Sequence, residues 1–99
     1  MAAPDLLVTH PDDNVATALR DLPAGAARVS GVQGEISLVA LGQPIRLGHK
    51  SALRHIPEGD LVIKHGQPIG RATAGIAAGE HVHVHNVESL SVDDGGATE

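Results

Sequence analysis

Short runs of apolar and β-branched residues recur along this chain, and most are ended within a few positions by glycine or proline. The runs cover 5–9, 27–32, 35–41, 61–65 and 81–87. Such runs, bounded by Gly, Pro, Asn and Asp, are typical of β-strands joined by close turns. Long amphipathic helical periods are lacking, so the pattern predicts an all-β protein, folded as a compact barrel or clip.

The segment after the first turn cluster, NVATALRDL, is ambiguous. Val15, Ala18, Leu19 and Leu22 fit the apolar face of a helix, with an aspartate of the turn as N-cap. Val15, Thr17 and Leu19 fit one face of a strand equally well. The local pattern alone supports both structures.

Two segments share the frame ALR-x-x-P-x-G, at 18–25 and 52–59, and GIAAG at 75–79 is a looser copy. Each is followed by a β-prone run. Proline at the second and glycine at the fourth position suit a type I turn. Internal duplication explains the recurrence, and so does the general use of Pro-Gly turns in small β proteins. Both explanations stay open.

Length and aromatic content narrow the possible functions. A chain of 99 residues forms one domain with one core, and is too short to add a deep, walled active site. We therefore expect it to function at an edge or interface and to have no activity alone. It contains no Phe, Trp or Tyr. An aromatic binding hot spot and a base-stacking platform are thus excluded.

Charge and hydropathy exclude other classes. The formal net charge is −5, and the seven Lys and Arg are spread singly, so nucleic acid is not an expected partner. There is no Cys for a disulfide or a thiolate metal site. No apolar run approaches the ~20 residues that span a bilayer, and the N-terminus lacks a signal-peptide pattern. These features predict a cytoplasmic protein with no membrane contact.

The most concentrated candidate chemistry is the run HVHVHN at 81–86. On a strand, His81, His83 and His85 share one face, and Val82 and Val84 point into the core. Neighbouring histidines then lie roughly 6.5–7 Å apart, close enough for two imidazoles to bind one ion. The outer pair is roughly 13 Å apart on a straight strand. We expect at most two ligands from this run and the rest from elsewhere; the alternative is a solvated strand face.

The triplet GHK offers two adjacent cations, His49 and Lys50, that could clamp a carboxylate. The alternative is an exposed turn. The isolated residues His10, His55 and His65 are interpreted as structural.

Taken in order, GHKSAL, IPEGDLVIKHGQPIG and AAGEHVHVHN closely resemble the SAF-domain small component of the altronate dehydratase family, and the early DNVATAL segment is included. The resemblance covers roughly residues 5–90. It implies a β-clip fold and a strand in the ambiguous segment. We therefore assign residues 1–90 to a SAF, or β-clip, domain. The polar, Gly-containing remainder, 91–99, is predicted to be a disordered tail.

The resemblance also implies an activity. Enzymes of this family eliminate water from sugar acids such as altronate or galactarate, or sulfite from sulfolactate. They depend on a divalent metal, usually iron, and a large catalytic chain carries most of the machinery. This chain would be a small accessory subunit, or an N-terminal domain, of such a lyase. The metal, Fe(II), would be held mainly by the large partner.

Residue by residue, His49 and Lys50 match the GHK of the family. His81, His83, His85 and Asn86 match its histidine strand. We accordingly predict that His49, Lys50 and Asn86 bind the sugar-acid carboxylate substrate and that His83 and His85 bind the metal. Two alternatives are the small subunit of a sulfolactate sulfo-lyase and a non-catalytic β module that binds a metal or small ligand. A homo-oligomer is an alternative assembly for the chain in isolation.

Overall fold

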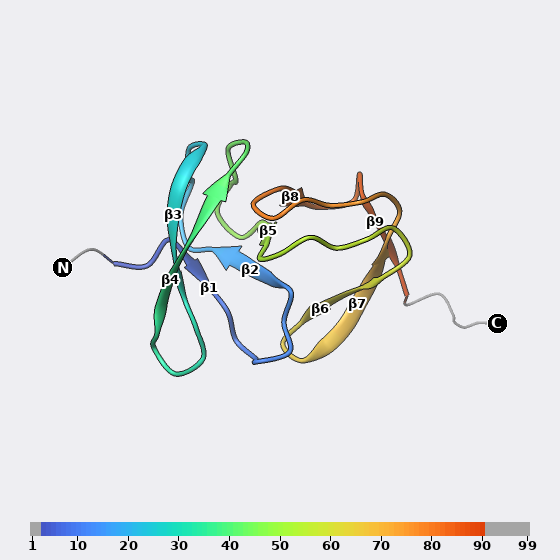
Figure 1. Cartoon of the computed structure of the whole chain (residues 1–99), viewed down its shortest axis with the longest axis horizontal. Helices are drawn as coiled ribbons and strands as arrows, with labels where there is room; N and C mark the ends of the chain where they lie inside the picture. The colour runs from blue at the N-terminus through green and yellow to red at the C-terminus, as the bar shows by residue number, and fades with distance from the viewer. Residues whose placement is uncertain (1–2, 91–99) are drawn as a thin grey trace.

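The computed structural model describes residues 3–90, in which two β-sheets form and no helix is present (Figure 1). The strands are β1 (Leu6–Leu7), β2 (Val15–Ala18), β3 (Gly25–Ser30), β4 (Ile36–Leu41), β5 (Lys50–Ala52), β6 (Leu61–Lys64), β7 (Gln67–Ala72), β8 (His81–Val82) and β9 (Val87–Ser89). One sheet has the order β4-β3-β1-β2-β5-β8, and the other has the order β6-β7-β9. The prediction of a compact all-β domain is confirmed.

The ambiguous segment is a strand, β2, which lies between β1 and β5 in the larger sheet. Its side chains alternate between two apolar clusters, as the two-residue period of a strand requires. The first cluster holds Leu6, Ala16, Ala18, Leu22, Ala27, Val29, Val39, Leu41 and Ile45. The second holds Val15, Ala52, Ile56, Val62, Ala72, Ile76 and Val82. Small aliphatic side chains thus fill both halves of the core without an aromatic residue.

Two of the recurring turn segments pair with each other, at Ile56 and Ile76, and the third pairs with the chain at Ile45. Leu22 pairs with Ile45 and Ile56 with Ile76, each through two backbone hydrogen bonds of 2.8 or 2.9 Å. The turns that contain Gly59 and Gly79 are not type I as expected. In the copy that ends in Gly59, the N–H of Asp60 donates to Pro57 O, which makes the glycine the third residue of the turn, with a φ of 90°. Type II turns require this left-handed third residue. The copy that ends in Gly79 has the same geometry, with the N–H of Glu80 donating to Ala77 O and a glycine φ of 84°, whereas Gly25 in the first copy already begins β3. Both explanations of the recurrence stay open.

Asn14 joins the two sheets. Its backbone N–H donates to Ile63 O and its carbonyl accepts from Leu53 N. Its side-chain amide donates to Leu61 O at 2.9 Å and accepts from Ile63 N at 2.8 Å. Because Asn14 is buried, these bonds satisfy groups that would otherwise be costly to bury. They fix β6 against the start of β2.

Two features of the sequence prediction are wrong. The strand expected at 81–87 is two short strands, β8 and β9, separated by a turn. In addition, β5 and β7 were not predicted, because the sequences KSA and QPIGRA lack alternating apolar residues. Both are stabilised by pairing with strands distant in sequence.

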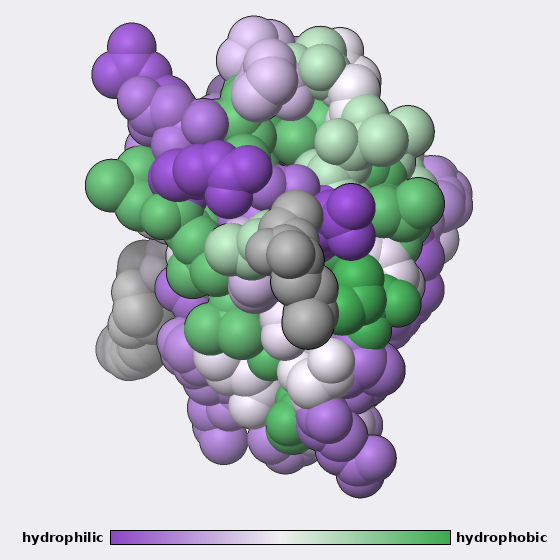
Figure 2. Space-filling model, turned by 90° about the vertical axis from the view of Figure 1, so that its left-hand side faces the viewer, coloured by the Kyte–Doolittle hydropathy of each residue, from purple (hydrophilic) through white to green (hydrophobic). Residues whose placement is uncertain are grey.

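Figure 2 shows the end of the molecule formed by β3 and β4, where separate green apolar groups lie among purple polar ones. Val32, Ile36 and Leu38 are exposed in this part of the chain. Within residues 3–90, no helix has the length and apolar character needed to cross a bilayer. The cytoplasmic location stays a prediction, and the predicted tail, 91–99, lies outside the described residues.

Candidate functional site

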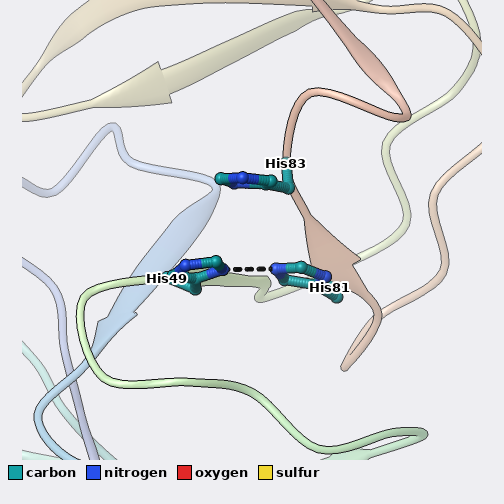
Figure 3. Close-up of side chains that lie close together, drawn as sticks. All are labelled: His49, His81 and His83. Carbon is teal, nitrogen blue, oxygen red and sulfur yellow. Dashed lines mark hydrogen bonds between the residues drawn. The ribbon is translucent and has the colours of Figure 1, made fainter.

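Three imidazoles from two distant segments come together beside β5 and β8. His49 immediately precedes β5, His81 begins β8, and His83 follows it (Figure 3). One ring nitrogen from each lies within 4.8 Å of the others. His49 Nδ1 and His81 Nε2 are 2.9 Å apart and share a hydrogen bond. The His83 ring stacks on that of His49, with centroids 4.4 Å apart and planes 16° from parallel.

The register of two short strands builds this cluster. β5 and β8 are antiparallel, with Lys50 opposite Val82 and Ser51 opposite His81. Continuing that register by one position brings His49 opposite His83. Gly48 has a φ of 82°, a conformation that glycine adopts readily, and it lies in the turn that leads into His49. The pairing of GHKS with HVH thus explains why the three histidines meet.

The chain leaves the strand path after Val82, contrary to prediction. Val82 is fully buried as expected, but the side chain predicted to follow it into the core, Val84, is 82% exposed. Residues 84–86 form a turn. The turn brings the ring centroid of His85 to 5.3 Å from that of His81, although a straight strand would separate these two residues widely. His81, to which we gave no ligand role, is in the cluster, whereas His85 lies beside it.

Asn86 makes the turn. Its Oδ1 accepts the N–H of His83 at 2.9 Å, and its Nδ2 donates to His81 O at 2.9 Å. Its backbone N–H donates to His83 O, and its carbonyl accepts from Thr73 N. Asn86 is buried, with 4% of its surface exposed. Its amide therefore positions two histidines, and its predicted contact with substrate stays a prediction.

Residues 4–90 match the family described as the altronate/galactarate dehydratase SAF domain. The chain belongs to this family. The SAF domain is 49% identical over 80 residues to an altronate dehydratase of Escherichia coli and 43% identical over 81 residues to one of Bacillus subtilis. Each match covers 81% of this chain and 15% of the relative.

A second class of relative is a separate subunit. Over 45 residues, the SAF domain is 51% identical to the (2R)-sulfolactate sulfo-lyase subunit alpha of Chromohalobacter salexigens. That match covers 46% of this chain and 48% of the relative. The chain thus spans a small fraction of the altronate dehydratases it matches and about half of this subunit. The resemblance identified in the sequence is confirmed.

Lys50 and His83 border one open hollow of about 230 Å³ on the surface of the SAF domain. The rest of its lining is mostly apolar and includes Ile69, Val84 and Val87. Lys50 is half-buried, and no carboxylate among the described residues forms an ion pair with it. The hollow therefore has the Lys50 ammonium, without a carboxylate partner, at the same edge as the histidine cluster.

Burial and neighbouring charge favour the neutral forms of His81 and His83. Burial lowers the pKa of His81 below its usual value, and the nearby imidazoles and Lys50 lower it further. The pKa of His83 is lowered by the same causes. At pH 7 both rings are accordingly unprotonated and carry a free lone pair. Burial, followed by repulsion from Lys64, lowers the pKa of Lys50 as well.

The remaining histidines and a larger hollow lie outside the cluster. His65 Nδ1 contacts the Thr9 hydroxyl, and His10 Nδ1 accepts the N–H of Asp12. The larger hollow, of about 520 Å³, is lined in part by the β3–β4 hairpin. The carboxylates in its lining, Asp13 and Glu35, accept backbone N–H groups. The larger hollow therefore has fewer side chains available to bind a ligand or transfer a proton than the smaller one.

Replacing Asn86 by alanine should lower the free energy of unfolding of the SAF domain by about 2 kcal/mol, because it leaves His83 N and His81 O without their partners. Gln43→Ala is the control, since Gln43 is exposed and accepts the N–H of His81 at a longer 3.3 Å. It should cost less than about 0.5 kcal/mol. Urea denaturation measures both, and equal losses would contradict this role for Asn86.

Proposed function

We propose that this SAF domain is the accessory part of a hydro-lyase that removes water from a sugar acid of the altronate type. It presents the histidine cluster and Lys50 to an active site built mainly by a large catalytic chain. The observation that carries the proposal is the β5–β8 pairing, which brings GHK and HVH together at an open hollow. The altronate dehydratases that it resembles extend far beyond the matched segment, which leaves ample length for a catalytic region.

The chemistry of the site suits a carboxylate substrate. Lys50 is a half-buried cation that an anionic ligand would neutralise, and a lysine ammonium offers three donors to carboxylate oxygens. Dehydration next to a carboxylate requires removal of a proton and stabilisation of the resulting enediolate. A divalent metal, which we propose is Fe(II) held mainly by the large chain, would supply the electrophilic stabilisation when bound. His49 and the neutral His83 are placed to orient the substrate or to carry a proton.

An apolar rim beside the site supports docking of a partner chain. Val84 is almost fully exposed between His83 and His85, and Ile69 is partly exposed in the same hollow. An exposed valine beside functional polar groups is explained if another surface covers it in the assembly. The sulfo-lyase relatives are named as alpha subunits, which implies a multi-subunit arrangement in those proteins. We propose the same division of roles here.

Capture of the partner tests the proposal. Tagged SAF domain, used as bait in extracts of its own source, should recover a large chain that resembles the rest of an altronate dehydratase. With Fe(II) and altronate, the isolated SAF domain should give no keto-acid product, whereas the complex should produce it. Turnover by the highly purified SAF domain alone would refute the accessory role. A recovered complex that does not dehydrate any sugar acid would refute the proposed reaction.

A sulfolactate sulfo-lyase is the second candidate, favoured by the 51% identity to the alpha subunit of that enzyme. The side chains that contact the leaving group belong, in this proposal, to the large chain, so the SAF domain serves either reaction. Sulfite release from sulfolactate by the same complex distinguishes the two. If no large chain is captured, the remaining candidate is a free-standing β module that binds a metal or small ligand.

A further inference from the structure

We infer that His49, His81 and His83 form a divalent-metal site that this chain fills without a partner. This goes beyond the sequence prediction, in which the histidine run gave at most two ligands and the large chain held the metal. The inference concerns the isolated chain and does not depend on the proposed dehydration. It rests on three features of the cluster: its nitrogen positions, its backbone supports and its ligand chemistry.

The nitrogen positions are close to those of a metal site. Four ligands at 2.0–2.1 Å from a tetrahedral zinc ion lie about 3.3 Å from one another. His49 Nδ1 and His81 Nε2 are already 2.9 Å apart, and the His83 nitrogen completes a set within 4.8 Å. The near-parallel rings must tilt to point at one ion. All three side chains are only partly buried, so this needs rotation of side chains and no movement of the core.

The backbone that carries the three ligands is held in place before any ion binds. The N–H of His49 donates to Arg46 O, and its carbonyl accepts from Ala18 N. His81 is paired with the fully buried Ser51, and the next residue, Val82, is anchored in the core. The Asn86 amide holds the backbone of both His81 and His83. Such preorganisation reduces the entropic cost of assembling three ligands around an ion.

The ligand set selects the class of metal. Three imidazoles with no carboxylate or thiolate suit borderline ions such as Zn(II), Fe(II), Co(II) or Ni(II), and do not suit Mg(II) or Ca(II). Three protein ligands leave a fourth position for water or another ligand, as in catalytic zinc sites. His83 and Lys50 both border the adjoining hollow. An ion in the cluster would therefore lie beside an open hollow with a cation at its edge.

The test titrates CoCl₂ and ZnCl₂ into the isolated full-length chain, with visible absorption and calorimetry as readouts. We expect one Co(II) per chain with the intense visible bands of four-coordinate cobalt, displacement by Zn(II), and no response to MgCl₂. His49→Ala, His81→Ala and His83→Ala should each weaken binding by roughly tenfold or more, the effect of losing a ligand or its orientation. His55→Ala is the matched control and should bind as the parent does.

NMR of the unsubstituted chain tests the site even if the alanine variants misfold. Zn(II) should shift the imidazole NMR signals of His49, His81 and His83 more than those of His10, His55 and His65. Absence of stoichiometric binding, an equal response to MgCl₂, or shifts centred on the other histidines would overturn the inference. Metal binding by the chain without dehydration by the complex would support this site and refute the proposed function. Dehydration by the complex without metal binding by the chain would support the proposed function and refute this site.

Discussion

His83→Ala is expected to lower the turnover of the proposed hydro-lyase complex by roughly tenfold or more, the loss found when a metal ligand or an orienting residue is removed. The His83 ring is partly exposed and contacts other histidines rather than the core, so the melting temperature of the SAF domain should change by only a few degrees. The backbone N–H of His83, which the Asn86 side chain accepts, is retained in the variant. The variant therefore separates the contribution of His83 to turnover from its contribution to stability.

The experiment measures melting of the isolated domain and turnover per folded complex, with His55→Ala as the control. His55 is exposed in a loop and lies outside the cluster, so this variant should match the parent in both measurements. A melt that falls by many degrees while turnover per folded complex is unchanged would show that His83 is structural. Loss of turnover in the control would show that the assay reports general damage to the complex.

Gly79→Ala is expected to destabilise the chain by about 3 kcal/mol or more, because two costs add. Gly79 has a φ of 84°, which disfavours any residue with a Cβ. A Cβ at this position would lie 1.9 Å from the carbonyl oxygen of Ala40. That oxygen belongs to β4, which is paired along its length with β3, so it cannot move freely. The substitution would displace the segment that leads into His81.

Gly75→Ala is the matched control for this prediction, four positions earlier in the same turn region. Gly75 has no left-handed φ, and the nearest atom to its Cβ position is His55 Nε2 at an ordinary 3.6 Å. Its effect on the free energy of unfolding should stay within about 1 kcal/mol. Urea denaturation of both variants provides the comparison. Similar stabilities for the two alanine variants would mean that the close approach to Ala40 is readily relieved.

Local sequence was sufficient for the fold class and for the positions of the turns, but not for the turn type or for every strand. Glycines and prolines at short intervals predicted an all-β chain because both residues favour turns and neither suits the interior of a helix. The two-residue period at Val15 and Thr17 was indistinguishable from a helical pattern, and the ambiguity disappears when β2 pairs on both sides. The strand β5 was missed because Lys50 and Ser51 carry no apolar alternation. Their extended structure comes from pairing with β2 and β8.

The sequence by itself determined the family, the all-β class and the histidines that could carry chemistry. Only the tertiary structure decided which of them meet. The run HVHVHN does not show where a strand would end. In the structure, β8 ends after Val82 because the Asn86 amide bonds to the backbone of His81 and His83 and forms a turn there. The partner of those histidines, His49, lies 32 residues from His81 and is brought to it by strand register. Register depends on long-range pairing, which a local pattern does not specify.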